Sequence, residues 1–233
     1  MSGRRIVLWR HGRTAWNAVR RAQGQLDVPL DDVGVEQARQ TAARLASLRP
    51  SIIVSSDLAR AWATAGELGR RADLEVAIDE DLREIHIGEW QGLSLEECAE
   101  RFPDEHRRWR AGEDVRRGGG ETYAETADRV ARAIERTVAE LAAGQTAVLV
   151  SHGVAIRVGA CRFLGIPPER WRAFGGLSSC SWVVLEEARL SWQLREWNAG
   201  SLPEPMLSDD VPSDEQAEAS AAAAESGSPA TLP

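Results

Sequence analysis

The chain has 233 residues, 43% of them hydrophobic, which is enough for one large α/β domain or two small ones with a buried core. It contains no apolar run of membrane-spanning length, and its first residues lack the apolar region and cleavage site of a secretion signal. We therefore expect a cytoplasmic protein without membrane contact. Every basic residue is an arginine, which excludes a Schiff-base lysine, a P-loop lysine and a Ser-Lys dyad.

The net charge of −8 belongs mostly to the end of the chain. Residues 198–233 hold seven acidic and no basic residues, whereas residues 1–197 hold 29 acidic residues and 28 arginines. Residues 1–197 are thus close to neutral and lack the excess of basic residues that nucleic-acid binding requires. The last stretch is rich in Ala, Ser and Pro and lacks aromatic residues, so we predict one domain over 1–197 and a disordered tail over 198–233.

Short apolar runs alternate with helical patterns. The runs predict strands at 5–9, 51–56, 74–79 and 146–151. The helical patterns cover 34–48, 57–71, 94–102, 121–144 and 153–165. Ser94 is an expected N-cap, Thr122 and Glu125 form an expected capping box, and Gly144 is expected to end the helix that this box begins. Residues 180–187 and 190–198 predict two strands joined by a short turn.

This order predicts an α/β fold with three layers, α/β/α, around a mostly parallel central sheet. The last two strands could add an antiparallel edge. Residues 82–120 look irregular, as expected of a lid or pocket wall. The three cysteines, Cys98, Cys161 and Cys180, form no CxxC pair, which indicates reduced thiols rather than disulfides or a zinc site.

Charged residues and histidines follow three of the predicted strands. Arg10, His11 and Gly12 follow the first strand, and His152 and Gly153 follow the strand at 146–151. Arg60 lies one turn into the helix after the strand at 51–56. The carboxyl ends of parallel strands share one edge of a sheet, so these side chains should converge there.

Such a cluster suits a phosphate. Arginine forks and helix N-termini bind phosphate oxygens, and the arginine charge lowers the pKa of a nearby histidine. A neutral His11 could then attack phosphorus and form a phosphohistidine, with the arginines stabilising the transferring group. Glu84 could protonate the leaving oxygen as general acid, whereas we expect Glu89 and His86 only to surround the site.

Each residue also has a plain structural interpretation. His11 could be a strand-end histidine, Arg60 a solvated helix residue, and Glu84 the structural ion-pair partner of Arg83 or of a pocket arginine. A metal site of His11, His152 and Glu84 has three plausible ligands, but Arg10 and Arg60 would oppose a cation. We expect neither a metal nor another cofactor.

Four segments resemble the histidine phosphatase superfamily, whose fold is the phosphoglycerate mutase-like one: RHG at 10–12, SSDLARAWATA at 55–65, LREIHIGEWQG at 82–92 and SHG at 151–153. The resemblance implies that His11 is the phosphorylated nucleophile and Glu84 the proton donor. It places Arg10, Asn17, Arg60 and His152 in the phosphate pocket. Gln23 and Gly24 would line that pocket, together with Gly153 of SHG.

Within this superfamily, mutases carry a longer insertion than the 67 residues between Glu84 and His152, which favours a phosphatase of a small phosphate ester. Stretches such as RAQGQLD and GGGET resemble the actinobacterial glucosyl-3-phosphoglycerate phosphatases. The alternatives are a 2,3-bisphosphoglycerate-dependent phosphoglycerate mutase, an α-ribazole or broad-specificity phosphatase, and a phosphate-binding regulatory module that uses the acidic tail. The resemblance also implies a homodimer, for which the edge of the terminal strand pair is a candidate.

Some residues outside these motifs have two alternative roles or none assigned. Arg13 departs from the Glu or Gln usual in the family and could affect substrate preference. The loop 108–120 holds four arginines, which we expect to be solvated rather than to form a lid over an acidic substrate. Trp90 could form a pocket wall, and His106 is expected to be solvated.

Overall fold

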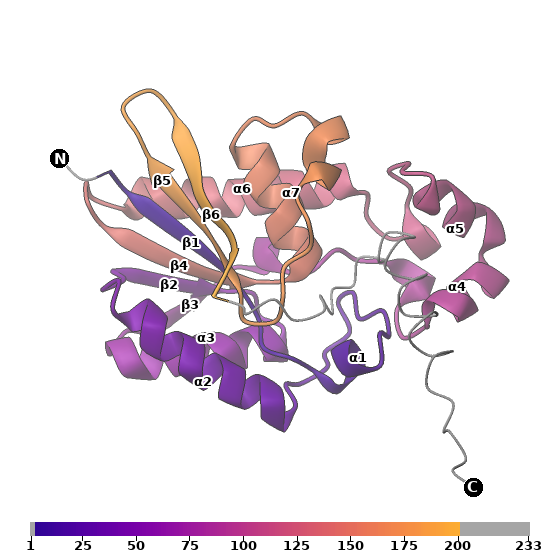
Figure 1. The fold of residues 1–233 in the computed structure, drawn as a ribbon, viewed down its shortest axis with the longest axis horizontal. Coiled ribbons are helices and arrows are strands. Elements are labelled where there is room, and N and C mark those ends of the chain that lie inside the picture. Colours follow the sequence, from indigo (N-terminus) through magenta and orange to yellow (C-terminus); the bar gives the residue numbers. More distant parts are fainter. Residues whose placement is uncertain (1–2, 201–233) are drawn as a thin grey trace, which may run out of the picture.

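The structure, a computed structural model, describes residues 3–200, and a six-stranded sheet lies at its centre (Figure 1). The strands are β1 (Arg5–Arg10), β2 (Ile52–Ser55), β3 (Val76–Ile78), β4 (Thr146–Ser151), β5 (Trp182–Glu187) and β6 (Trp192–Ala199). Their order across the sheet is β3-β2-β4-β1-β5-β6. Strands β1 to β4 pair in parallel, while β5 runs antiparallel to β1 and β6 to β5. The mostly parallel sheet and its antiparallel edge are confirmed.

Helices cover both faces of the sheet (Figure 1). Alternate residues of β1 point to opposite faces, and both sets are buried. Ile6 and Leu8 join an apolar core with residues of α6 (Tyr123–Glu140) and α7 (Gly153–Phe163). Val7 and Trp9 join a second core with residues of α2 (Asp32–Ala46) and α3 (Ala59–Ala72). The predicted three-layer architecture is therefore confirmed.

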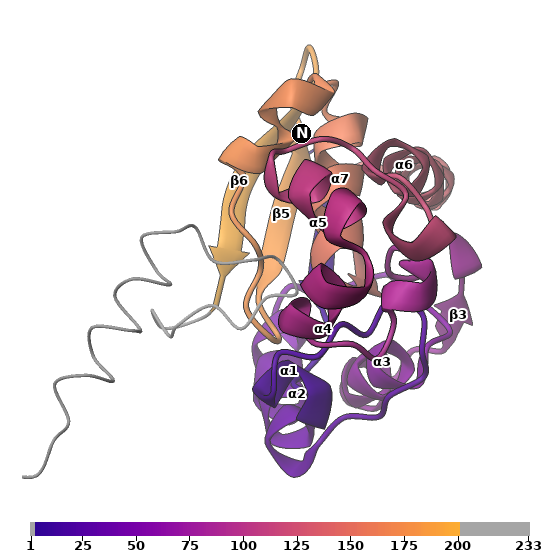
Figure 2. The ribbon, with the colours of Figure 1, turned by 90° about the vertical axis from the view of Figure 1, so that its right-hand side faces the viewer.

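The segment predicted to be irregular folds largely into a small helical cap (Figure 2). It contains α4 (Leu95–Arg101), whose predicted N-cap Ser94 is present, and α5 (Pro103–Arg110). Helix α5 was not expected because its sequence is almost entirely charged. Its ends nevertheless follow the usual rules, with a proline at the first position, acidic residues in the first turn and arginines in the last.

An apolar core that the cap shares with α6 and α7 holds it in place. Trp90 is 1% exposed, and its ring lies edge-on to that of Trp109 at 5.5 Å between centroids. His106 packs against both rings, at 5.9 and 5.7 Å, and its pKa is lowered by burial and by Arg110. His106 is therefore half-buried rather than fully solvated, because its ring packs against the aromatic cluster.

Two element boundaries differ from the prediction, and one short helix was not predicted. Helix α6 ends at Glu140, because Leu141 is extended; Gly144, with φ 80°, instead lies in the following turn. A short helix, α1 (Ala15–Ala18), follows β1. Strand β6 continues to Ala199, where Asn198 accepts a hydrogen bond from the Ser178 N–H at 2.7 Å.

Further predictions concern the capping box, the cysteines and the tail. The capping box of Thr122 and Glu125 is present. The three cysteines are free and buried, as predicted. Most of the acidic tail falls outside the described residues. Within residues 3–200, no helix is both long and apolar enough to cross a membrane.

Candidate active site

The parallel register of the sheet brings the ends of β1, β2 and β4 together. Arg10 lies opposite Ser151, and the His11 N–H donates to the Ser151 carbonyl at 3.0 Å. On the other side of β4, the Ser56 N–H donates to the Val150 carbonyl at 2.9 Å. As a result the rings of His11 and His152 lie 5.1 Å apart between centroids. The predicted convergence at the carboxyl edge is confirmed.

His11 is held as a neutral imidazole with the lone pair on Nε2. Its side chain is buried, and Nδ1 lies 2.6 Å from the Gly12 carbonyl oxygen. Because a carbonyl only accepts, Nδ1 carries the proton and Nε2 keeps its lone pair. Burial lowers the pKa of His11 well below its ordinary value, as do the charges of Arg60 and Arg10, against a smaller opposing effect of the Gly12 contact.

A close backbone approach positions the turn after His11. A Cβ at Gly12 would lie 2.4 Å from the Gly34 carbonyl oxygen, and a Cβ at Gly34 would lie 2.0 Å from the Arg13 carbonyl oxygen. No side chain fits between the end of β1 and the start of α2. The glycine after His11 therefore lets the chain turn against α2, and its N–H donates to Thr64 on α3.

Arg60 links three parts of the site. Helix α3 begins at Ala59, so Arg60 lies in its first turn, and it is 1% exposed. Its Nε donates to His152 Nδ1 at 3.2 Å, Nη1 to the Leu26 carbonyl at 2.8 Å and Nη2 to the Gly24 carbonyl at 2.7 Å. The guanidinium thus fixes the loop at 24–26 as well as the second histidine.

His152 is oriented through both of its ring nitrogens. Since the Arg60 Nε–H only donates, Nδ1 accepts and the proton lies on Nε2, which is 2.9 Å from Ser56 Oγ. Burial, followed by the charge of Arg60, lowers the pKa of His152 well below its ordinary value. Sequence reasoning missed Ser56, although it closes a predicted strand and the strand-end rule could have found it.

Arg10 is fully buried at the centre of the cluster. Its Nη1 donates to the Leu177 carbonyl, and Gly153 packs against its guanidinium, since a Cβ at that glycine would lie 3.5 Å from Arg10 Nε. The Cys180 N–H donates to the His11 carbonyl at 3.1 Å. The segment before β5 therefore supports both residues of the RH pair.

Of the remaining predicted pocket residues, Asn17 lies in α1, and Gln23 and Gly24 lie on the loop after it. Thr14 caps this helix and forms a capping box with Asn17, whose Oδ1 accepts from the Thr14 N–H at 3.0 Å. Thr14 Oγ1 also lies 3.0 Å from Gln23 Oε1, and Gln23 Nε2 is buried with no hydrogen-bond partner among the described residues. Gly24 adopts φ 53°, and a Cβ there would lie 2.5 Å from Gln91 Oε1.

The Glu84 carboxyl group lies at the N-terminus of α7. Oε1 accepts from the N–H groups of Ile85 and Ala155, both at 2.9 Å, and Oε2 from that of Val154 at 3.2 Å. Helix α7 begins directly after His152, so this contact brings the predicted proton donor to the histidine cluster. Arg83 does not supply the alternative ion pair, because it binds Asp57.

Several other candidates lie outside this cluster. Arg13 forms an ion pair with Asp31 at 2.9 Å. Two arginines of the 108–120 loop pair with acids, Arg108 with Glu113 and Arg116 with Glu125. A third is buried rather than solvated, because its guanidinium lies against the rings of Trp109 and Tyr123; this is Arg117. Glu89 is exposed, and Trp90 belongs to the core of the cap.

The donor set of the cluster does not favour a metal. Within residues 3–200, no three His, Cys, Asp or Glu side chains lie close enough together to hold one. Both ring nitrogens of His152 already have protein partners. Arg10 and Arg60 supply positive charge where a cation would have to bind, and an anion suits them instead.

Comparison with known proteins agrees with this geometry. A family profile described as "Histidine phosphatase superfamily (branch 1)" matches residues 6–200. The chain is 39% identical over 218 residues to a glucosyl-3-phosphoglycerate phosphatase of Mycolicibacterium vanbaalenii, covering 86% of this chain and 97% of the relative. It is 36% identical over 187 residues to phosphoserine phosphatase 1 of Hydrogenobacter thermophilus, covering 79% and 88%.

Solved structures show the same similarity. A mycobacterial glucosyl-3-phosphoglycerate phosphatase in complex with VO3 superposes with a TM-score of 0.79 at 38% identity, covering 84% of this chain and all of that one. A phosphoserine phosphatase mutant of Entamoeba histolytica in complex with phosphoserine gives a TM-score of 0.74 at 27% identity, covering 84% and 97%.

Proposed function

Because the chain belongs to the histidine phosphatase superfamily, we propose that it is a phosphomonoesterase that acts through a phosphohistidine at His11. One observation carries this proposal. His11 is buried and neutral, with its proton on Nδ1 and the lone pair on Nε2, between Arg10 and Arg60. A neutral imidazole beside two arginines is the arrangement that attack on a bound phosphate requires.

The reaction proceeds in two steps. The lone pair of His11 Nε2 forms a bond to phosphorus while the bond to the ester oxygen breaks, and Glu84 donates its proton to that oxygen. Water then attacks the phosphohistidine, Glu84 takes a proton from it, and the phosphorus–nitrogen bond breaks to release inorganic phosphate. Arg10 and Arg60 stabilise the charge on the transferring group in both steps.

The substrate is proposed from the relatives. Glucosyl-3-phosphoglycerate phosphatases of two mycobacterial genera match over 86% of the chain at 37–39% identity. We propose glucosyl-3-phosphoglycerate or a related sugar or glycerate phosphate. The mutase reaction is the second candidate, because a probable phosphoglycerate mutase of Salmonella paratyphi C is 34% identical over 197 residues.

The test of the phosphohistidine uses ³²P-labelled substrate and rapid quenching. The wild type should carry a label that is stable in base and lost in acid, and His11→Asn should carry none and lose turnover of p-nitrophenyl phosphate by about 10⁴-fold or more. Turnover should persist in EDTA. A labelled His11→Asn protein, or activity that EDTA abolishes, would contradict the proposal.

A substrate panel separates the remaining alternatives. Glucosyl-3-phosphoglycerate, phosphoglycerates, phosphoserine and α-ribazole phosphate are compared by phosphate release. Conversion of 3- to 2-phosphoglycerate after priming with 2,3-bisphosphoglycerate would identify a mutase. Tight binding of a phosphorylated partner without any hydrolysis would identify the regulatory module.

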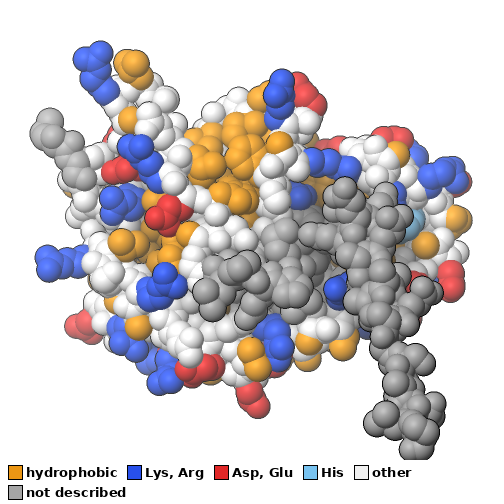
Figure 3. All heavy atoms as spheres, viewed as in Figure 1, with side chains coloured by type: hydrophobic (Ala, Val, Ile, Leu, Met, Phe, Trp, Pro, Cys, Tyr) orange, Lys and Arg blue, Asp and Glu red, His pale blue; other side chains and the backbone are white. Residues whose placement is uncertain are grey.

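Cytoplasmic location and a homodimer stay predictions. Strand β6 lies at the edge of the sheet, and its Trp192 packs against Phe163 with ring centroids 5.2 Å apart. Figure 3 shows hydrophobic side chains at the surface over the area that β6 and α7 occupy in Figure 1. Sedimentation of the wild type beside a variant with a charge at Leu194 would test whether this side joins two copies.

A further inference from the structure

The segment that carries Glu84 has no regular structure of its own. It connects the short turn at Glu80–Leu82 to the next one at Gly88–Trp90. Its carbonyl groups accept hydrogen bonds from other parts of the chain, with the Leu82 carbonyl bound by Ser151 Oγ at 2.7 Å and the His86 carbonyl by the Glu121 N–H at 2.7 Å. The position of the Glu84 backbone therefore depends on donors outside the segment.

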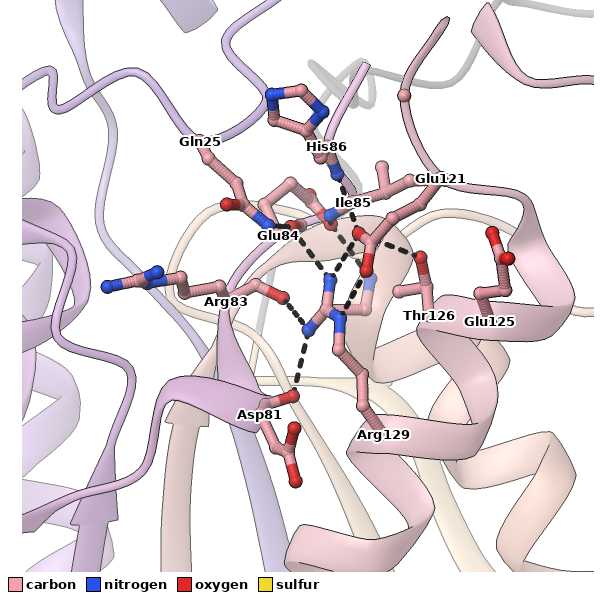
Figure 4. Close-up of polar contacts among 12 residues, drawn as sticks. Gln25, Asp81, Arg83, Glu84, Ile85, His86, Glu121, Glu125, Thr126 and Arg129 are labelled. Atoms are coloured by element: carbon pink, nitrogen blue, oxygen red, sulfur yellow. Dashed lines mark hydrogen bonds and ion pairs between the residues drawn. The ribbon is translucent and has the colours of Figure 1, made fainter. Parts of the chain in front are cut away.

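Arg129 of α6 supplies three such donors (Figure 4). Nη1 donates to the carbonyls of Asp81 and Arg83 at 2.8 and 2.6 Å, and Nη2 donates to that of Glu84 at 2.9 Å. Nε and Nη2 also bind the two carboxylate oxygens of Glu121, at 2.8 and 2.9 Å. All five N–H groups of the guanidinium are therefore in use, in a planar arrangement that a lysine cannot reproduce.

Glu121 completes the support. Besides Arg129, its carboxylate accepts from the His86 N–H at 2.8 Å and lies 3.3 Å from Thr126 Oγ1. Burial raises the pKa of Glu121, but Arg129 and the His86 N–H outweigh it, so the pKa lies below its ordinary value. Glu121 therefore remains a carboxylate and fixes the segment two residues beyond Glu84.

Gln25 connects this support to the pocket. Gln25 Nε2 donates to the Glu84 carbonyl at 2.9 Å, the same oxygen that Arg129 binds (Figure 4). Gln25 lies between Gly24 and Leu26, whose carbonyls bind Arg60. The Glu84 carbonyl is thus held from two sides, by α6 and by the loop that Arg60 fixes.

We propose that Arg129 and Glu121 are positioning residues that hold Glu84 where it can protonate the leaving group. This inference rests on the proposed function, because it assumes that Glu84 donates a proton as the phosphorus–oxygen bond breaks. Neither residue touches the substrate. Their loss should therefore affect the reaction only as far as it requires the Glu84 proton.

The experiment compares kcat/KM for two substrates with different leaving groups. p-Nitrophenolate leaves without a proton, whereas the alkoxide of glycerol 3-phosphate needs one. We expect the ratio of kcat/KM for glycerol 3-phosphate to that for p-nitrophenyl phosphate to fall about 10²-fold in Glu84→Gln. In Arg129→Lys it should fall about tenfold, because the segment shifts by a fraction of an ångström.

Milder variants and a control complete the test. Glu121→Gln and Gln25→Ala should lower the ratio in the same direction, and they decide the question if Arg129→Lys does not fold. Arg132→Lys is the matched control, since Arg132 lies on the same helix but is 56% exposed and only approaches Asp81, at 3.7 Å. It should leave the ratio unchanged.

The outcomes separate the two proposals. If Glu84→Gln leaves the ratio unchanged, the acid role of Glu84 in the proposed function fails. If Glu84→Gln lowers the ratio but the Arg129, Glu121 and Gln25 variants change both substrates equally, only the positioning inference fails. In the double variant, Arg129→Lys should not lower the ratio further once Glu84 is replaced by Gln.

Discussion

The Nε–H of Arg60 donates to Nδ1 of His152 at 3.2 Å, which joins the first turn of α3 to the end of β4. Through the same guanidinium, the Gly24 and Leu26 carbonyls are tied to that histidine. Arg60 therefore organises the proposed phosphate pocket by hydrogen bonds in addition to supplying charge. That double role leads to a specific expectation for its replacement by lysine.

Arg60→Lys should lower kcat/KM by about 10²–10³-fold, because one ammonium group keeps the charge but cannot reach His152 and both carbonyls. Inhibition by inorganic phosphate should weaken as well. Arg70→Lys is the control on the same helix, where Arg70 is 68% exposed and pairs with Glu67. Equal activity of the two variants would show that charge alone matters at position 60.

Stability should depend on pH through the two buried histidines. The pKa values of His11 and His152 lie well below 6.5 in the folded protein, so the unfolded chain binds protons first as the pH falls. The contribution of the two histidines to the free energy of unfolding should therefore be constant above pH 7 and decrease below about 6.5, by up to about 1.4 kcal/mol per pH unit for each histidine. Urea unfolding between pH 7.5 and 5.5 measures this slope.

His11→Asn and His152→Asn test the source of that slope. Each should remove about half of it, because one buried proton acceptor is lost. His106, whose pKa is lowered by burial and Arg110, contributes a smaller part and remains in both variants. A slope that is unchanged in the double variant would assign the pH dependence to other groups.

Two glycine replacements should have opposite effects. In Gly34→Ala the new methyl group would meet the Arg13 carbonyl oxygen at 2.0 Å, so we expect a loss of about 1–3 kcal/mol in unfolding free energy and reduced activity as the turn after His11 shifts.

Gly66 lies inside α3, where a Cβ would meet only Arg70 Nη1 at 3.4 Å. Gly66→Ala should stabilise the protein by about 0.5–1 kcal/mol. Thermal melting of both variants checks the signs.

Arg13 should prove structural rather than specificity-determining. It pairs with Asp31, whose side chain also accepts from the Gly34 N–H and caps α2. Arg13→Ala should cost about 0.2–1 kcal/mol and leave substrate preference unchanged. Asp31→Ala also loses the cap and should cost about 1–2 kcal/mol. A changed order of substrates in Arg13→Ala would restore the specificity hypothesis.

Much of the fold was predictable because the elements have local signals. The strand at Arg5–Arg10 is apolar on both faces, and the helix starting after Thr122 has its capping box in the sequence. Helix α5 was missed because its sequence lacks an apolar face wide enough to stand out, and the packing of Trp109 against Trp90 that helps to stabilise it is a tertiary contact.

The sequence by itself determined the chemistry of the candidate site, because Arg10, His11, Arg60 and His152 follow strands whose parallel order forces them to one edge. It could not determine proton positions or the support of Glu84. Those depend on single contacts, such as that of the neighbouring Gly12 carbonyl with His11 and those of the Arg129 guanidinium with three carbonyls of a distant segment. Hydrogen bonds of this kind have no periodicity or fixed spacing, so only the tertiary structure decides them.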